Sequence, residues 1–405
     1  MKRTSLLNLI FVGILLATSS CTAPEPPSKV LLISFDGFIN EYVERNPTPN
    51  FDRFIADGVQ AEYLIPVFPT KTFPNHYSTV TGLHPENHGI ITNSFYDDRL
   101  EARFSYGPQG TPNDERWWGG EPIWTTVEKQ GLTASTFFWP GSEASINGVL
   151  PTRWMDYDGS VPNEARVDSV LAWLDPQGPV QADFATLYFS DVDSRGHSYG
   201  PNSPEVDEAV IEMDHLLGML MDGLEEIGLL NEVHILITSD HGMAELSHDK
   251  VIFLDDIIDL DDVDVIDWTP VAMLQPKEGR TETLYAQLKE AEENYRVFMR
   301  DDLPDHYRFS NHYRIPDILM IADISWTITS RPFYEDRGLI AATHGYDHME
   351  EKMRTFFAAN GPRFRSGETA EAFQLVHLYE LMAHLLGVEP APNDGDFEAV
   401  RPLLQ

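Results

Sequence analysis

Three aspartates and three histidines stand in four short segments, each at a point where a predicted strand ends. The six are Asp36, Asp193, His197, Asp240, His241 and His344. Carboxylates and imidazoles are the side chains that hold divalent metals such as zinc. Six ligands suffice for two ions with three protein ligands each, which leaves open coordination positions for a substrate. The residue types and their placement predict a two-metal hydrolase.

Each of these residues taken alone has a simpler interpretation. A single aspartate after a strand is more often a helix cap or a turn residue than a ligand. Asp240 and His241, followed by Gly242, are more telling because neighbouring side chains can reach one ion. Asp193 and His197, four residues apart, can also converge on one ion. Four such segments, all at strand ends, favour the metal-site interpretation.

The surrounding chain alternates strand-like and helical patterns. Continuous apolar runs at 30–34, 184–189 and 234–238 are typical of buried parallel strands, and 354–358 resembles a further strand. Amphipathic patterns at 49–58 and 204–227 predict helices. This alternation predicts an α/β fold with a mostly parallel sheet and helices on both faces. Sites in such sheets form beyond the carboxyl ends of the strands, where the six residues fall.

Residues 245–340, approximately, interrupt this alternation. They contain an acidic run at 255–264, a charged segment near 281–300 that we expect to be helical, and a segment rich in Tyr and Pro at 305–333. We expect an inserted subdomain beside the sheet. No linker composition separates it, so residues 29–405 are expected to form one catalytic domain.

The N-terminus has the pattern of an export signal. Basic residues at 2–3 precede an apolar stretch at 6–17 that is short for a membrane span, which predicts a signal peptide at 1–20 and a tether at 21–28. The only cysteine, Cys21, follows directly and resembles a bacterial lipoprotein acylation site. An ordinary cleaved signal is the alternative. Either interpretation predicts an exported protein, periplasmic or in the cell envelope. The lipoprotein interpretation, which we favour, adds membrane contact through a lipid anchor on Cys21.

The chain is strongly acidic. Lys and Arg total 28 against 65 Asp and Glu, a formal net charge of −37. This charge disfavours binding to nucleic-acid backbones or anionic membranes through bulk electrostatics. A small anionic substrate is still compatible with it, because bound metal ions are the largest charges within a site.

A candidate nucleophile lies in the segment 69–77. Thr72 directly precedes Phe73 and Pro74, where a helix is expected to begin. A hydroxyl ahead of an early proline is an ordinary helix start, and Thr72 can be a cap. The positive potential there, with a bound metal, would also favour an alkoxide nucleophile. Thr70 is the weaker candidate, and three nearby histidines are expected to be structural: His76, His84 and His88.

Several motifs together resemble the nucleotide pyrophosphatase/phosphodiesterase family of the alkaline phosphatase superfamily. They are PVFPTKTFPNHYSTVTGLHPENHGI at 66–90, WWGGEPIW at 117–124, FWPGS at 138–142, TSDHG at 238–242, HGYD at 344–347, LYELM at 378–382 and PAPNDG at 390–395. The resemblance covers nearly the whole chain after the tether. It implies an alkaline-phosphatase-like α/β/α sandwich. Without the cysteine-rich and nuclease-like modules of animal members, we expect a bacterial member that has the catalytic domain only.

The resemblance also implies roles for the candidate residues. Thr72 would attack phosphorus and form a phospho-threonine intermediate, and Asn93 would hydrogen-bond a phosphate oxygen. The implied cofactors are two Zn²⁺ ions, for which manganese or iron are alternatives on ligand chemistry. One ion would be held by Asp36, Asp240 and His241, with Thr72 as a further contact. The other would be held by Asp193, His197 and His344.

The expected substrate is a small nucleotide-type phosphodiester or pyrophosphate. Phe73 directly follows Thr72, and by the resemblance Tyr157 stands at the spacing where nucleotide-cleaving members have a second aromatic residue. The two rings could stack on a nucleobase, although both could be ordinary wall or core residues. Other branches of the family cleave lysophospholipid or choline phosphodiesters. Two cations near the site, Lys71 and Arg195, leave a phosphomonoesterase or phosphonate hydrolase as an alternative, and a non-catalytic binding lipoprotein is a further one. Two more departures from the family pattern are Asp191 and His348.

Overall fold

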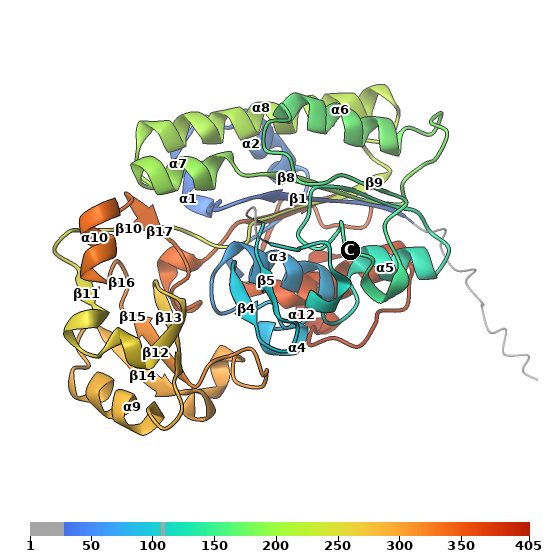
Figure 1. The fold of residues 1–405 in the computed structure, drawn as a ribbon. Helices are drawn as coiled ribbons and strands as arrows, with labels where there is room; N and C mark the ends of the chain where they lie inside the picture. Colours follow the sequence, from blue (N-terminus) through green and yellow to red (C-terminus); the bar gives the residue numbers. More distant parts are fainter. Residues whose placement is uncertain (1–27, 107–109) are drawn as a thin grey trace, which may run out of the picture.

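The computed structural model describes residues 28–106 and 110–405 (Figure 1). The predicted signal peptide and the tether residues 21–27, including Cys21, lie outside the described residues. In the described part of the chain, no helix combines the length and the apolar character needed to cross a membrane.

An eight-stranded sheet forms the centre of the fold. Its strand order is β19-β2-β18-β9-β1-β8-β6-β7. β18 is antiparallel to both its neighbours and the other pairings are parallel, which confirms the predicted mostly parallel α/β sheet. The strands are β1 (Lys29–Phe35), β2 (Val59–Ala61), β6 (Ala134–Phe137), β7 (Arg153–Trp154), β8 (Phe184–Phe189), β9 (Val233–Thr238), β18 (Phe357–Asn360) and β19 (Glu368–Ala370).

Strand β1 is covered on both faces, as its continuous apolar run predicts. Val30 and Leu32 pack into one core cluster, while Leu31 and Ile33 pack into another on the opposite face. The longest helix over the second cluster is α8 (Pro204–Glu226), which begins where the Ser203 hydroxyl accepts the Val206 N–H. Alternating side chains therefore bind helices to both faces of the strand.

The helices form two layers on the sheet (Figure 1). One layer contains α1 (Asn40–Arg45), α2 (Pro49–Ala56), α6 (Asn163–Leu174), α7 (Asp191–Tyr199) and α8. The other contains α3 (Thr72–Thr81), α4 (Pro85–His88), α5 (Ile123–Lys129), α11 (Leu378–Leu386) and α12 (Phe397–Val400). Two short strand pairs accompany this second layer: β3 (Leu64–Ile65) with β20 (Phe373–Gln374), and β4 (Phe95–Asp97) with β5 (Ala102–Phe104).

A second, antiparallel sheet lies beside the first (Figure 1, yellow to orange). Its order is β12 (Val263–Asp267), β13 (Val271–Pro276), β15 (Ile318–Ala322) and β14 (Tyr295–Met299), and it shares a separate core cluster with α9 (Thr281–Glu290). Connections to the main sheet run through β11 (Val251–Phe253) with β16 (Thr327–Thr329), β10 (Ala244–Glu245) with β17 (Ala342–Thr343), and α10 (Arg331–Arg337).

Two sequence expectations need correction here. The helix expected near 281–300 ends at Glu290, and residues 295–299 form β14. Asn294 turns the chain with a φ of 59°, and the next residues alternate between buried Tyr295, exposed Arg296 and buried Val297, a period of two. The strand expected at 354–358 begins only at Phe357.

Candidate active site

The carboxyl ends of three adjacent strands position the first ligand candidates. β1 pairs with both β8 and β9, so Asp36 after β1 lies near Asp240 and His241 after β9. The Gly37 N–H donates to Asp240 Oδ1 at 3.1 Å. Gly37 has a φ of 67°, and a Cβ there would approach Asp193 Cα to 3.1 Å. Glycine therefore permits the close approach of the strand-end loops.

The six predicted residues form two trios, each with donor atoms within 4.8 Å of one another: Asp36, Asp240 and His241, and Asp193, His197 and His344. In the first trio, His241 Nε2 lies 3.0 Å from Asp240 Oδ2 and 3.4 Å from Asp36 Oδ1. All three residues of this trio are buried. The structure thus places the six side chains in the same two groups that the family resemblance implies.

The second trio combines a helix with a distant loop. Asp193 and His197 are one turn apart on α7, with Oδ1 and Nε2 3.3 Å apart. His344 follows β17, and its Nε2 lies 3.8 Å from Asp193 Oδ1. The rings of His344 and His241 stack with centroids 3.4 Å apart, so the two trios are side by side.

Each imidazole of the two trios is held by a backbone carbonyl. The Nδ1–carbonyl distances lie between 2.8 and 3.0 Å, for His241 to Gly242, His197 to Ala342 and His344 to Thr70. When Nδ1 carries the proton that is donated, the Nε2 lone pair faces the trio. Histidine ligands of metals are oriented in this way.

Three carboxylate oxygens in the trios are buried without a hydrogen-bond partner: Asp36 Oδ1, Asp193 Oδ1 and Asp240 Oδ2. An unpaired buried carboxylate oxygen is costly, and such groups are normally paired or bound to metal. Together with three oriented imidazoles, this donor set fits divalent cations. The residues present are therefore suited to metal ions.

The electrostatics of the trios point the same way. Burial raises the pKa of Asp36 well above its usual value, and the nearby Asp240 and Asp193 raise it further. Burial lowers the pKa of His344 well below its usual value, and His241 and His197 lower it further. His344 is therefore a neutral imidazole, the form that binds metal, while clustered carboxylates require a positive partner.

Thr72 begins helix α3 beside the first trio. Its Oγ1 lies 3.3 Å from His241 Nε2. The residue before it, Lys71, is the N-cap, and no side chain caps the helix. The hydroxyl of Thr72 is therefore directed at the trio rather than at the helix backbone. Thr70 instead donates its hydroxyl to the Tyr346 carbonyl at 3.0 Å, inside the protein.

Asn93 contacts the same helix start. Its Oδ1 accepts the Phe73 N–H at 2.9 Å. Because the amide oxygen is engaged, the NH₂ group is the part of Asn93 that can donate to a bound anion. This contact links Asn93 to the residue directly after Thr72.

Two of the three nearby histidines, His76 and His88, have hydrogen-bond partners inside the protein. His76 Nε2 lies 2.8 Å from Ser34 Oγ, and its Nδ1 lies 2.9 Å from the Thr72 carbonyl. His88 Nε2 lies 2.9 Å from Ser78 Oγ. These contacts support the helix that carries Thr72.

Lys71 and Arg195 form ion pairs with carboxylates that do not belong to the trios. Lys71 Nζ lies 2.5 Å from Asp267 Oδ2, on the second sheet. Arg195 is 3.5 Å from Glu208 and 3.7 Å from Glu212, on α8. Each cation already faces carboxylates. In this structure both cations are thus paired with carboxylates of the protein.

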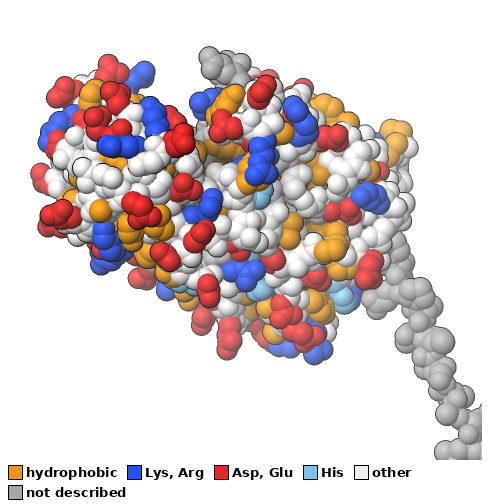
Figure 2. Space-filling model, turned by 60° about the horizontal axis from the view of Figure 1, so that its bottom comes forward, with side chains coloured by type: hydrophobic (Ala, Val, Ile, Leu, Met, Phe, Trp, Pro, Cys, Tyr) orange, Lys and Arg blue, Asp and Glu red, His pale blue; other side chains and the backbone are white. Residues whose placement is uncertain are grey.

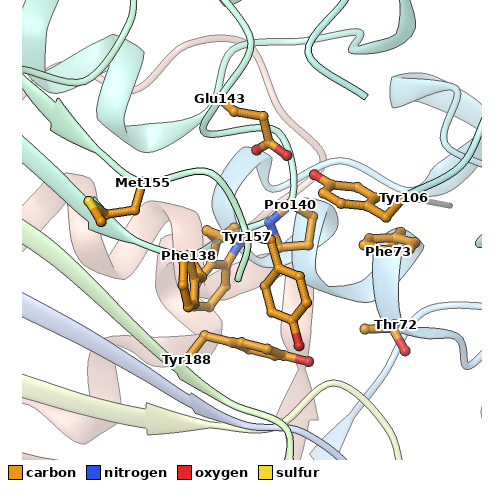
Figure 3. A pocket seen from close by; sticks show the side chains of 10 residues that line it. Thr72, Phe73, Tyr106, Phe138, Pro140, Glu143, Met155, Tyr157 and Tyr188 are labelled. Atoms are coloured by element: carbon orange, nitrogen blue, oxygen red, sulfur yellow. The ribbon is translucent and has the colours of Figure 1, made fainter. Parts of the chain in front are cut away.

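An aromatic cavity of about 160 Å³ opens next to Thr72 (Figure 3). Both predicted aromatic residues line it, and Tyr157 is 47 % exposed. One face of Phe73 is stacked on Tyr106 with centroids 4.5 Å apart, and Figure 3 shows the phenol of Tyr157 directed into the space beside Thr72. Planar rings on two sides suit a flat heteroaromatic group.

Tyr106, Glu143 and Tyr188 are among the lining residues that were not anticipated from the sequence. Tyr188 donates its hydroxyl to Asp36 Oδ2 at 2.6 Å, so one side chain connects the cavity wall with a trio. The sequence signal that could have identified Tyr188 is its position near the end of β8, just before α7. Tyr106 and Glu143 lie in loops far apart in sequence, and no spacing pattern joins them.

Glu143 gives the cavity a pH-dependent group. Burial raises its pKa from an ordinary 4.5 to about 7. Since folding raises this pKa, the contribution of Glu143 to stability is complete below about pH 4.5 and is lost as the pH rises through 7. The side chain of Glu143→Gln stays neutral at every pH. We therefore expect the Tm of the variant minus the Tm of the wild type to be about 2 °C larger at pH 8 than at pH 5. Calorimetry of both proteins checks this, and an equal difference at both pH values would contradict it.

The fold and the site together define a class of protein. A mostly parallel α/β sheet with two carboxylate–imidazole trios at its strand ends, beside a threonine on a helix N-terminus, is the arrangement of a metal-dependent phosphate-ester hydrolase. The chain belongs to the type I phosphodiesterase / nucleotide pyrophosphatase family, whose model matches residues 30–347. This confirms the predicted family, the alkaline-phosphatase-like fold and the prediction of a metal-dependent enzyme.

Alignments with individual relatives cover most of the chain. Human bis(5′-adenosyl)-triphosphatase ENPP4 is 38 % identical over 402 residues, 98 % of this chain and 87 % of that protein. Venom phosphodiesterase CdcPDE of Crotalus durissus collilineatus is 38 % identical over 96 % of this chain and 48 % of its own length. Murine ectonucleotide pyrophosphatase/phosphodiesterase 5, solved as an inactive T72A variant in complex with AMP, superimposes with a TM-score of 0.89 at 35 % identity, covering 93 % of this chain and 100 % of that chain.

Proposed function

We propose that the protein hydrolyses nucleotide phosphodiester or pyrophosphate bonds with Thr72 as the nucleophile. The observation that carries this proposal is the position of Thr72, whose Oγ1 lies 3.3 Å from His241 Nε2 and which also lines the aromatic cavity. The Thr72 hydroxyl thus lies between the first trio of candidate metal ligands and the cavity that suits a planar base. A nucleotide bound there would have its phosphate at the hydroxyl.

The reaction would proceed in two displacements. Thr72 gives up its hydroxyl proton to solvent as Oγ1 forms a bond to phosphorus and the bond from phosphorus to the leaving oxygen breaks; the leaving oxygen takes up a proton from solvent. Water then cleaves the bond between phosphorus and Oγ1, which restores the hydroxyl and releases the nucleotide. The NH₂ group of Asn93 would hold a phosphate oxygen, and the positive end of the α3 dipole would favour the phosphate charge.

We propose two zinc ions as the cofactor, one for each trio. Bound ions would neutralise phosphate charge and stabilise the attacking and leaving oxygens. The donor set of three carboxylates and three Nε2 atoms supports zinc among the divalent metals.

The nucleobase would lie between Phe73 and Tyr157. We expect Tyr157→Ala to raise KM for a nucleotide diester about tenfold, because stacking on one aromatic ring is worth about 1–3 kcal/mol. Turnover of methyl p-nitrophenyl phosphate, whose retained methyl group has no ring to stack, should change less than twofold. Steady-state kinetics on both substrates checks this, and an equal loss on both would argue that Tyr157 has a structural role only.

The proposed diester activity is tested by comparing thymidine 5′-(p-nitrophenyl phosphate) with p-nitrophenyl phosphate. Because Lys71 and Arg195 face protein carboxylates, we expect kcat/KM for the diester to exceed that for the monoester by at least about a hundredfold. A preference for the monoester would instead identify a phosphomonoesterase.

We also propose that the protein is exported, with a catalytic domain at 29–405 that includes an inserted subdomain at about 245–340. A relative named human ectonucleotide pyrophosphatase/phosphodiesterase family member 5, 36 % identical over 399 residues, supports export. The lipid anchor at Cys21 rests on the sequence pattern alone. Acidic side chains are interspersed with Lys and Arg over the face shown in Figure 2, without a continuous basic patch, which supports a small-molecule substrate rather than a nucleic acid.

A further inference from the structure

Asp267, the last residue of β12, connects the second sheet to two segments of the active site. Its Oδ2 lies 2.5 Å from Lys71 Nζ and also accepts the hydroxyl of Thr92. Lys71 directly precedes Thr72, and Thr92 directly precedes Asn93. One carboxylate therefore binds the neighbours of both the proposed nucleophile and the proposed phosphate-binding amide.

These contacts are shielded from solvent and involve both carboxylate oxygens. The exposed fraction is 10 % for the Lys71 side chain, 19 % for that of Asp267 and 1 % for Thr92. Lys71 Nζ also donates to the Thr269 carbonyl at 3.1 Å, and the Trp268 N–H donates to Asp267 Oδ1 at 2.9 Å. Charge-assisted hydrogen bonds of this kind are short and strong, so they hold the three side chains in a defined arrangement.

A β-bulge directs the Asp267 carboxylate to these partners. Along β12, Val265 pairs with Leu274 and Asp267 pairs with Met273, so Ile266 is an extra residue. A regular strand would put Asp267 on the same face as Val265, which packs against the core of the second sheet. The bulge interrupts this alternation, as bulges beside active sites do when they re-aim a side chain.

The Asp267 contacts reinforce a direct link between the two segments. The Phe73 N–H donates to Asn93 Oδ1 at 2.9 Å. Asp267 adds a second connection, earlier in each segment, through its contacts with both. Two connections fix the distance from the Thr72 hydroxyl to the Asn93 amide, and a displacement of about 1 Å between reacting groups can lower a rate about a hundredfold.

We propose that Asp267 is a positioning residue for phosphoryl transfer: it holds Lys71 and Thr92 together and thereby sets the Thr72 hydroxyl against the Asn93 amide. This inference rests on the proposed diester hydrolysis at Thr72. Asp267 acts through these neighbours and does not line the aromatic cavity. The second sheet thus contributes to catalysis without supplying a nucleophile or a residue of either trio.

Substitutions at the two ends of the contact between Asp267 and Thr92 test this role. We expect Asp267→Asn to lower kcat for thymidine 5′-(p-nitrophenyl phosphate) at least about tenfold, with KM changed less than about twofold because the base-binding cavity is unaltered. Thr92→Val keeps the ion pair and loses only the hydroxyl, and it should lower kcat about fivefold. Thr92→Ser, which retains the hydroxyl, should restore most of that loss.

A double variant shows whether the two residues act as one unit. Asp267→Ala removes the acceptor of the Thr92 hydroxyl, so adding Thr92→Val should lower kcat less than about twofold further. Two independent losses that multiply would overturn the connection through Asp267.

The control is Asp264→Asn, which makes the same change of charge at an exposed position on β12. Its kcat should equal that of the wild type. Kinetics run well below the Tm of every variant, with metal content measured alongside, separate positioning from unfolding or loss of metal.

A wild-type kcat in Asp267→Asn or Thr92→Val, equal losses in Thr92→Ser and Thr92→Val, or a fall in kcat that follows lost metal would overturn the positioning role. Each of these results leaves diester hydrolysis intact. A wild-type protein that cleaves no nucleotide diester would overturn the proposed function itself.

Discussion

Replacing Thr72 with alanine is expected to abolish hydrolysis of nucleotide diesters, with kcat/KM reduced at least about a thousandfold. The reason is geometric: the Thr72 hydroxyl lies 3.3 Å from His241 Nε2, while the neighbouring Thr70 hydroxyl is bound to the Tyr346 carbonyl. Within this segment, Thr72 is therefore the hydroxyl directed at the trio. Steady-state kinetics with thymidine 5′-(p-nitrophenyl phosphate) measures the loss.

The matched control for this variant is Thr72→Ser. Serine keeps the hydroxyl and loses only a methyl group, so a substantial fraction of the activity should remain. Metal content should be similar in both variants, because the six aspartate and histidine ligands are unchanged. Retention of more than a few per cent of activity by Thr72→Ala would remove Thr72 from the role of nucleophile.

Loss of one carboxylate from a trio is expected to remove one metal ion as well as activity. Asp240→Asn and Asp193→Asn each exchange a charged ligand for a neutral amide in a different trio. Removing an anionic ligand weakens metal binding strongly, and we expect kcat/KM to fall at least about a hundredfold. Elemental analysis after dialysis should give about one ion fewer per chain than in the wild type.

Asp191→Asn is the matched control for Asp193→Asn. Asp191 lies on the same turn of α7, but its Oδ2 accepts the Asn163 amide at 3.0 Å rather than facing the trio. This variant should keep its full metal content. If Asp193→Asn bound as much metal as Asp191→Asn, the second trio would not be a metal site.

The sequence predicted the fold where local patterns were unambiguous. The apolar runs at β1, β8 and β9 identified the central strands because burial on both faces leaves no polar alternation. β14 was mistaken for helix because its charged neighbours resemble the exposed face of α9. There the pairing with β15, a tertiary contact, determines the structure.

The site shows the same division between local and long-range information. Asp240 and His241 are adjacent in sequence, so their convergence is a local property. His344 and Asp193 are in contact, but the residues of the whole second sheet lie between them in the sequence. Only the resemblance to a family predicted that they belong to the same trio. The hydrogen bond from Tyr188 to Asp36 and the ion pair of Lys71 with Asp267 depend on tertiary packing, which no spacing in the sequence encodes.

The central claim is that hydrolysis proceeds through a covalent bond between phosphorus and Thr72. Rapid acid quenching of the enzyme during turnover of thymidine 5′-(p-nitrophenyl phosphate), followed by peptide mass spectrometry, tests it most directly. The proposed mechanism predicts a thymidine monophosphate adduct on the peptide that contains Thr72, absent in Thr72→Ala. Continued turnover without any adduct on that peptide, together with activity in Thr72→Ala, would contradict the claim.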